Sequence, residues 1–213
     1  MKKKNRNSMI AGFALLAGFV LWTVLVRTVD LKAIGPQASS VGFASFNGWF
    51  HALTGVNMTF YTITDWLGLV PICTALGFAV LGLVQLIKRN SLAKVDRSIL
   101  VLGGFYVVVI AVYLLFEVVV INYRPILING ILEASYPSSS TMLVMCVMPT
   151  AIMQLRQRMK NDLLRASVTL AIVIFIAFMV IGRIISGVHW ISDIIGGALF
   201  STGLVMIYNS LKE

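Results

Sequence analysis

Long apolar runs alternate with short polar segments along most of this chain. A helix of about 20 apolar residues spans the roughly 30 Å hydrocarbon core of a bilayer. A hydropathy window of about 19 residues predicts six such helices, at about 8–27, 66–87, 98–121, 138–155, 166–185 and 189–210. The pattern therefore predicts an all-α fold, a polytopic membrane protein built as a six-transmembrane-helix bundle.

The composition agrees with this interpretation, since 59% of the 213 residues are hydrophobic and 12% are charged. The basic stretch "MKKKNRN" before the first apolar run is also typical of a signal peptide. That run is longer than the apolar part of most signal peptides, however, and it lacks a clear cleavage site. We therefore expect a first transmembrane helix there, and a single transmembrane domain over residues 1–213.

Lysine and arginine gather in three segments that precede or separate the predicted helices. They are Lys2, Lys3, Lys4 and Arg6, then Lys88, Arg89, Lys94 and Arg97, and then Arg156, Arg158, Lys160 and Arg165. All three segments fall on one side of the predicted bundle, and the positive-inside rule makes that side cytoplasmic, together with both termini. The net charge of +9 then mostly reports topology, and a compact chain with a basic N-terminus suggests a bacterial cytoplasmic membrane. We expect no nucleic-acid partner, because the charges are divided among short loops without interleaved aromatic residues.

Residues 30–64 form a segment on the opposite, outward side that mixes aromatic residues with glycine and serine. The stretch "FASFNGWFHAL" within it predicts a short helix at the level of the lipid headgroups. His51 belongs to this stretch, and we interpret it as an interfacial side chain rather than a ligand. Cys73 and Cys146 lie in apolar runs without a second cysteine or a histidine at metal-ligand spacing, which predicts core side chains rather than a disulfide or a metal site.

Glycine pairs occur in two of the predicted helices. We expect them to allow close helix packing. The pairs are Gly103 with Gly104 and Gly196 with Gly197.

The stretch "GRIISGVHWISD" at 182–193 holds Arg183, His189 and Asp193 at the edge of two apolar runs. Ionisable residues inside a membrane are costly and indicate a functional site. If the sixth helix already includes His189, the spacing of four places His189 and Asp193 on one face, where the carboxylate can reach the imidazole. The "SG" pair at 186–187 predicts a turn, so that Arg183 ends the fifth helix beside them. The alternative is a structural salt bridge between Asp193 and Arg183 beside an interfacial histidine.

Arg124 and the stretch "YPSSST" at 136–141 are expected on the same outward side. They add a second guanidinium and a cluster of hydroxyl and N–H donors at a predicted helix N-terminus. Arginine pairs and helix N-termini are suited to binding a phosphate group. Glu133 lies in the same outward loop and either pairs with Arg124 or faces water. The constellation predicts a phosphate site with a histidine directed at it.

These stretches resemble a known family. "YRP" at 123–125, "YPSSS" at 136–140 and "GRIISGVHWISD" at 182–193 follow one another like the three signature motifs of the type 2 phosphatidic acid phosphatase superfamily. The superfamily includes bacterial undecaprenyl pyrophosphate phosphatases and, more distantly, the vanadium haloperoxidases, which are soluble. The resemblance covers about residues 60–210, a phosphatase-like core, and implies the six-helix membrane bundle of that superfamily.

The resemblance also implies roles for the matching residues. His189 would be the nucleophile that accepts the phosphoryl group, and Asp193 would be the carboxylate that orients it. No metal or organic cofactor is expected. The residues that would bind the substrate phosphate are Arg124, Ser138, Ser139, Ser140 and Arg183.

Three positions depart from the family pattern. Glu117 stands where the first motif has a lysine, and Ser140 stands where the second motif ends in the histidine that protonates the leaving group. Gly182 replaces the serine that usually precedes the arginine of the third motif. A carboxylate beside a phosphate site is unfavourable unless it is protonated or paired.

The absence of a histidine at position 140 affects which substrate is expected, because that histidine acts as the general acid in the family. A general acid contributes about 10²–10⁴ in rate, and it matters most for a poor leaving group such as an alkoxide. A lipid monophosphate that leaves from a pyrophosphate is a more stable anion, so the sequence favours a membrane lipid phosphatase that acts on a polyprenyl pyrophosphate such as undecaprenyl pyrophosphate. The alternative is a degenerate member that binds or transports a lipid phosphate without hydrolysing it. Ser140 is also compatible with an engineered, inactivating change.

Overall fold

The computed structural model describes residues 3–212, so the prediction for Lys2 lies outside the described residues. These described residues fold into helices and two 3-10 turns. The helices are α1 (Lys3–Thr28), α2 (Ala44–Thr54), α3 (Met58–Leu67), α4 (Leu69–Arg89), α5 (Arg97–Val118), α6 (Ser139–Arg158), α7 (Asp162–Ser186) and α8 (Ile191–Leu211), and the turns are η1 (Pro36–Ala38) and η2 (Leu92–Lys94).

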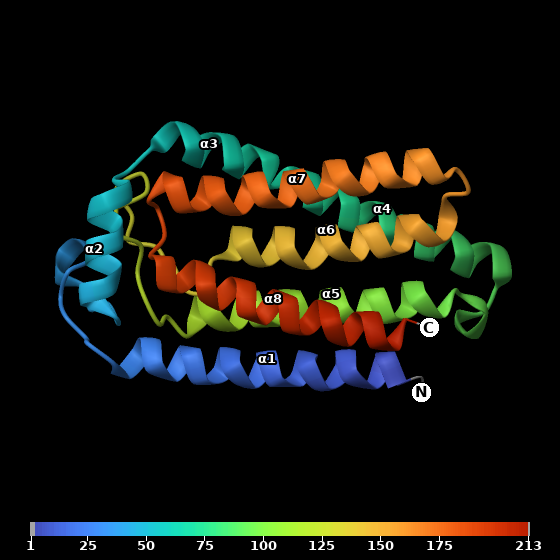
Figure 1. Ribbon diagram of the computed structural model, residues 1–213, viewed down its shortest axis with the longest axis horizontal. Coiled ribbons are helices and arrows are strands. Elements are labelled where there is room, and N and C mark those ends of the chain that lie inside the picture. The colour runs from blue at the N-terminus through green and yellow to red at the C-terminus, as the bar shows by residue number, and fades with distance from the viewer. Residues whose placement is uncertain (1–2, 213) are drawn as a thin grey trace.

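The long helices run side by side, and α2 lies across one end of the bundle (Figure 1). Helix α8 packs against α1 and α6, and α6 also packs against α7. Five helical segments of the described chain are long and apolar enough to cross a membrane, namely α1, the α3–α4 pair, α5, α7 and α8. The predicted all-α, polytopic membrane fold is confirmed.

Helix α6 is the sixth long helix, at the place of the fourth predicted span, but it does not belong to these five. It carries polar side chains that the bundle buries, among them Thr141, Thr150 and Gln154. These groups find partners inside the protein; the Thr150 hydroxyl, for example, donates to the carbonyl oxygen of Cys146 at 3.0 Å. A helix surrounded by other helices needs a less apolar surface than one that faces lipid.

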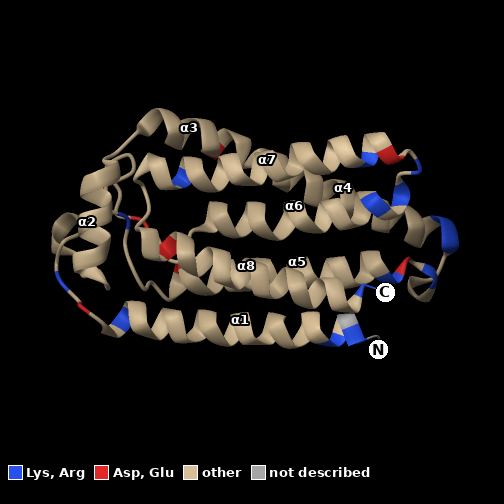
Figure 2. Cartoon of the chain, in the orientation of Figure 1, with Lys and Arg blue, Asp and Glu red and all other residues tan. Residues whose placement is uncertain are grey.

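Basic residues outnumber acidic ones at the end of the bundle where both termini lie, whereas the opposite end carries charges of both signs more evenly (Figure 2). The last turn of α4 ends in Lys88 and Arg89, and the last turn of α6 contains Arg156 and Arg158. The three basic segments of the sequence therefore meet at one end of the molecule. The other end, where α2 crosses the bundle, holds the motif residues.

The segment 30–64 contains η1, α2 and most of α3. The short helix predicted through "FASFNGWFHAL" is confirmed as α2. Helix α3 continues almost directly into α4, with a break at Gly68, whose N–H bonds to the carbonyl oxygens of both Thr64 and Asp65. The second long helical segment therefore starts earlier than predicted, at Met58.

Small residues bring α8 close to its neighbours. An added Cβ at Gly203 would lie 2.9 Å from the carbonyl oxygen of Gly12 in α1, and one at Gly196 would lie 2.6 Å from the ring of Tyr136. A Cβ at Gly197 would lie 3.4 Å from Thr141 of α6, so the predicted helix packing is confirmed at Gly197, whereas Gly196 makes room for the loop residue Tyr136. The same prediction for Gly103 and Gly104 is wrong, because no described heavy atom lies within 4 Å of a Cβ at either position.

The two cysteines have different environments. Both are free thiols. Cys146 is buried in the core of α6, as predicted, but Cys73 is exposed on α4, so its assignment to the core is wrong. In an apolar run that faces lipid, a residue can be hydrophobic without being buried in the protein.

Candidate active site

His189 lies in the short connection between α7 and α8. Helix α7 ends at Ser186, and Gly187 follows in the left-handed conformation with φ +63°, which a glycine adopts without steric cost. The predicted turn at 186–187 is confirmed. The expected helical start is not, because α8 begins only at Ile191, with Trp190 as its N-cap. His189 and Asp193 therefore do not share a helix face.

The His189 ring is almost fully buried, with 5% of its surface exposed. Its Nδ1 lies 3.1 Å from the carbonyl oxygen of Ser135, and its Nε2 lies 3.3 Å from Nη1 of Arg124. A carbonyl oxygen only accepts and a guanidinium only donates, so this arrangement assigns the hydrogen to Nδ1 and a free lone pair to Nε2. Nε2 is thus the ring nitrogen with an available lone pair.

The surroundings of His189 keep its ring uncharged. Burial, and then the positive charges of Arg124 and Arg183, hold the pKa of His189 well below its usual value of 6.5. A neutral imidazole retains the lone pair that attack on phosphorus requires.

Asp193 reaches the histidine through another residue. The carboxylate is fully buried, and its Oδ2 accepts hydrogen bonds from the Ser135 hydroxyl at 2.6 Å and from the Trp190 N–H at 3.1 Å. The Ser135 hydroxyl in turn lies 3.0 Å from Nδ1 of His189. The predicted direct contact between the carboxylate and the imidazole is therefore replaced by a bridge through Ser135, because His189 precedes the helix that carries Asp193.

The loop from 119 to 138 supplies the residues around this pair. It folds back on itself as a narrow hairpin, with antiparallel bridges between Tyr123 and Ala134 and between Ile128 and Ile131. Positive φ angles at Asn129 and Gly130 form its tip, a combination typical of tight hairpin turns. The hairpin sets Arg124 opposite Glu133, whose carbonyl oxygen accepts from the Arg124 N–H at 3.1 Å.

Asn122, at the base of the hairpin, fixes the other oxygen of Asp193. Its side-chain amide donates to Oδ1 at 3.0 Å, and its carbonyl oxygen accepts from the Ser135 N–H at 2.9 Å. Asn122 and Ser135 lie just outside the three sequence motifs. The "NG" pair at 129–130 was the available signal, since a tight turn there brings the two flanks of the loop together.

Arg124 is held by two neighbours. Its Nε forms an ion pair with Oε2 of Glu133 at 3.0 Å, one of the two alternatives that the sequence left open, and its Nη1 points to His189. The Arg124 side chain is 12% exposed. The first-motif arginine and the third-motif histidine thus meet, although 65 residues separate them.

Arg183 pairs with a residue outside the three motifs. Its Nη2 lies 3.0 Å from Oδ1 of Asp65, and its guanidinium lies 5.1 Å from the centre of the Tyr61 ring. The alternative of a salt bridge between Arg183 and Asp193 is therefore wrong. Asp65 was recognisable as an acidic residue at the edge of an apolar run.

Three consecutive serines, Ser138 to Ser140, lie at the start of α6. Ser138 is the N-cap residue and is fully buried, and its hydroxyl accepts a hydrogen bond from Thr141 at 3.0 Å. Ser139 and Ser140 instead line a cavity of about 390 Å³, together with Asp65 and Arg183.

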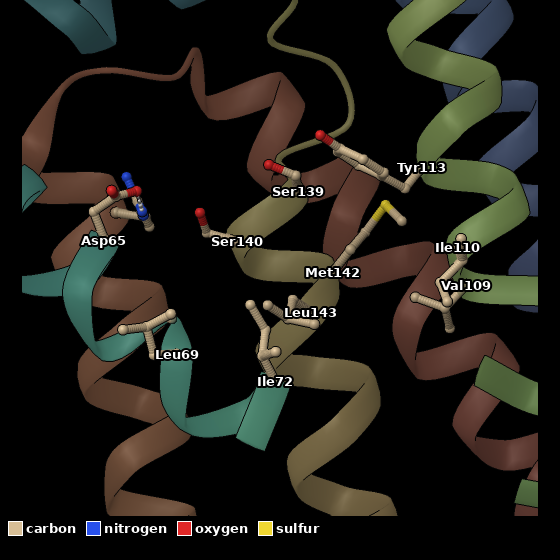
Figure 3. Close-up of a pocket in the computed structure, with 12 residues that line it drawn as sticks. Asp65, Leu69, Ile72, Val109, Ile110, Tyr113, Ser139, Ser140, Met142 and Leu143 are labelled. Atoms are coloured by element: carbon tan, nitrogen blue, oxygen red, sulfur yellow. Dashed lines mark hydrogen bonds and ion pairs between the residues drawn. The ribbon is translucent and has the colours of Figure 1, made fainter. Parts of the chain in front are cut away.

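The cavity is amphipathic. Its polar end holds the two serines and Asp65, and apolar residues from three helices form the rest of its wall (Figure 3). These apolar residues are Leu69, Ile72, Val109, Ile110, Met142 and Leu143. A phosphate group and a hydrocarbon chain would each find a suitable surface in one space.

Glu117 lines a second cavity, of about 520 Å³, which is bordered by Arg124, Glu133 and Ser139. Ser139 lines both cavities. Glu117 therefore lies close to Arg124 and Ser139, two of the residues predicted to bind phosphate, as its place in the first motif predicts.

Trp190 and His51 close the site on the side of α2. The Trp190 side chain is 3% exposed and donates from Nε1 to the carbonyl oxygen of Tyr123 at 2.7 Å. His51 packs on the Trp190 ring with 5.4 Å between ring centroids, and its Nε2 lies 3.0 Å from the carbonyl oxygen of Gly187. His51 therefore supports the connection that carries His189.

Comparisons with known proteins agree with the fold. A family model described as the PAP2 superfamily matches residues 104–212. Among solved structures, a transmembrane PAP2-type phosphatidylglycerolphosphate phosphatase from Bacillus subtilis is similar, with 19% sequence identity, a TM-score of 0.57 and 93% of each chain covered. No curated protein matches the chain by sequence. At this identity the solved structure supports the fold alone, whereas the family model covers just over half of the chain. The chain is a multi-pass membrane protein that belongs to the PAP2 superfamily.

Proposed function

We propose that the protein hydrolyses the headgroup of a lipid phosphate through a phosphohistidine on His189. The observation that carries the proposal is the state of that ring, whose Nδ1 donates to Ser135 while Nε2, beside Arg124, keeps its lone pair. A phosphate-binding protein without chemistry needs the arginines but not a histidine held in this way.

The proposed reaction has two steps. Nε2 of His189 attacks the terminal phosphorus, the bond from that phosphorus to the leaving oxygen breaks, and the lipid departs with the electron pair. A water then attacks the phosphohistidine, the P–N bond breaks, and its electron pair returns to Nε2 as inorganic phosphate is released. Binding exchanges the hydrogen bond between Arg124 and Nε2 for one to a phosphate oxygen, so that Arg124 stabilises charge on the transferring group.

The amphipathic cavity supports a lipid substrate. The phosphate of the lipid would lie near Arg183, Ser139 and Ser140, and its hydrocarbon chain would follow the apolar wall between α4 and α5. Polyprenyl pyrophosphates such as undecaprenyl pyrophosphate are the substrate class that we propose, because Ser140 supplies no acid and a phosphate leaving group needs none.

The orientation of the protein is part of the proposal. The basic end of the bundle would face the bacterial cytoplasm with both termini, and the site would open to the outer surface. Residues 60–210 would form the phosphatase core, and residues 30–64 would lie at the outer headgroups as its cover.

Phosphate release by purified protein in lipid nanodiscs tests the proposal, with undecaprenyl pyrophosphate and phosphatidate as substrates. We expect release from the pyrophosphate, trapping of an acid-labile phosphohistidine by rapid quenching, and loss of both in His189→Ala. Ser201→Ala is the control, since its hydroxyl lies in α8 and donates to the carbonyl oxygen of Met142; this variant should retain the phosphorylated intermediate.

A non-catalytic lipid-phosphate protein is the second candidate. Glu117 and Ser140 favour it, because they replace two groups that the family uses for phosphate binding and proton transfer. Such a protein would bind the lipid in a manner that depends on Arg124 and Arg183, without phosphate release. A transporter would also move labelled lipid between leaflets whether or not His189 is intact.

A further inference from the structure

The pairing of Arg183 is asymmetric. Its side chain is 2% exposed, whereas that of its partner Asp65 is 60% exposed. A buried guanidinium requires a counter-anion, and Asp65 supplies one in the structure. The Nε of Arg183 is buried without a hydrogen-bond partner among the described residues, so the guanidinium retains donor capacity for a second anion.

The position of Arg183 does not depend on Asp65 alone. The guanidinium lies over the Tyr61 ring, a cation–π arrangement that holds it from one side. Helix α3 also approaches α7 closely, because a Cβ at Gly182 would lie only 2.6 Å from Cγ2 of Thr64. The glycine that departs from the family pattern thus allows α3 to bring Asp65 and Tyr61 to the arginine.

Asp65 shares the cavity with the donors of α6. Figure 3 shows Asp65 on one side of the cavity and Ser139 and Ser140 on the facing start of α6. An anion that binds between the two serines and Arg183 would contact the same guanidinium that the Asp65 carboxylate contacts. The Asp65 side chain is 60% exposed and directly follows the segment 30–64 that we propose to lie at the outer headgroups, so at that level it can turn to water at a modest cost.

We propose that Asp65 is the internal counter-anion of the empty site and competes with phosphate for Arg183. The inference rests on the proposed function in taking this cavity as the phosphate site. A lipid phosphate can offset the competition by contacts of its chain with the apolar wall, whereas free phosphate has no such contacts. Asp65 therefore promotes the release of inorganic phosphate and limits its occupancy of the site.

Binding of inorganic phosphate to the full chain in nanodiscs, measured by isothermal titration calorimetry, tests the competition without any turnover. We expect Asp65→Asn to lower the Kd for phosphate roughly fivefold, in line with the modest strength of a largely exposed ion pair. Asp65→Ser should act in the same direction. Asp162→Asn is the matched control, because Asp162 also pairs with an arginine of α7, Arg165 at 2.6 Å, and it should leave the Kd unchanged.

A double-mutant cycle separates direct competition from a general effect of charge. In an Arg183→Gln background, Asp65→Asn should no longer tighten phosphate binding. Unchanged or weaker binding in Asp65→Asn, or equal tightening in both backgrounds, would overturn the inference. Tightening without any lipid hydrolysis would sustain it and reject the proposed enzyme. Hydrolysis that depends on His189, with an unchanged Kd in Asp65→Asn, would support the proposed enzyme and overturn this inference.

Discussion

The hydroxyl of Ser135 is the link between the buried carboxylate and the candidate nucleophile. It donates to Oδ2 of Asp193 at 2.6 Å and lies 3.0 Å from Nδ1 of His189. Ser135→Ala removes this hydroxyl but retains the backbone carbonyl that accepts from Nδ1. The ring should then keep its tautomer while losing its connection to the negative charge.

The size of the effect follows from the contacts that remain. A hydrogen bond to a charged group contributes about 1.5–3 kcal/mol, and Asp193 still accepts from Asn122 and the Trp190 N–H. A loss of about 2 kcal/mol corresponds to roughly 30-fold in rate if it falls on the transition state. We therefore expect kcat to fall between about tenfold and a hundredfold, with a smaller change in KM, because the Ser135 hydroxyl bonds to Asp193 and His189 rather than to the two arginines predicted to bind phosphate.

The assay is phosphate release from undecaprenyl pyrophosphate under saturating conditions, together with a thermal unfolding scan. Ser201→Ala is the matched control, since Ser201 is a fully buried serine of α8 whose hydroxyl donates to the carbonyl oxygen of Met142 at 3.4 Å. Equal kcat values for Ser135→Ala and Ser201→Ala would refute the bridge, whatever their unfolding temperatures.

Three further predictions concern other positions of the site. Because the pKa of His189 lies well below 6.5 in the folded protein, the unfolded state takes up this proton first, so stability should fall as the pH drops below about 6.5. Unfolding scans across pH should show a smaller decline for His189→Gln, and an equal decline would contradict the assignment. Ser140→His restores the acid of the family and should raise kcat/KM on a lipid monophosphate by about 10² or more, whereas no gain would identify Glu117 as the obstacle. Gly182→Ala places a Cβ 2.6 Å from Thr64 and should destabilise the protein by about 1–3 kcal/mol, while Gly103→Ala, in open space, should be neutral or stabilising; a reversed order of their unfolding temperatures would reject this account.

The local sequence was sufficient for the elements and for the chemistry of the motifs. Hydropathy predicted the six long helices, five of which belong to segments long and apolar enough to cross a membrane, since the length and composition of a membrane helix are local properties. The "SG" pair predicted the end of α7, and the third motif identified His189 as the candidate nucleophile. The predictions of the helices and the turn depend on neighbours within a few residues along the chain, whereas the role of His189 is implied by the resemblance of all three motifs to the family.

Only the tertiary structure decided which groups meet. Whether His189 joins α8 depends on where the helix is capped, and the cap at Trp190 excludes the direct contact with Asp193. The bridge through Ser135 requires a hairpin between α5 and α6 to reach the start of α8. Asp65 reaches Arg183 only because α3 packs on α7, 118 residues away along the chain. Hydropathy does not encode such contacts, because they arise from the packing of whole helices against one another.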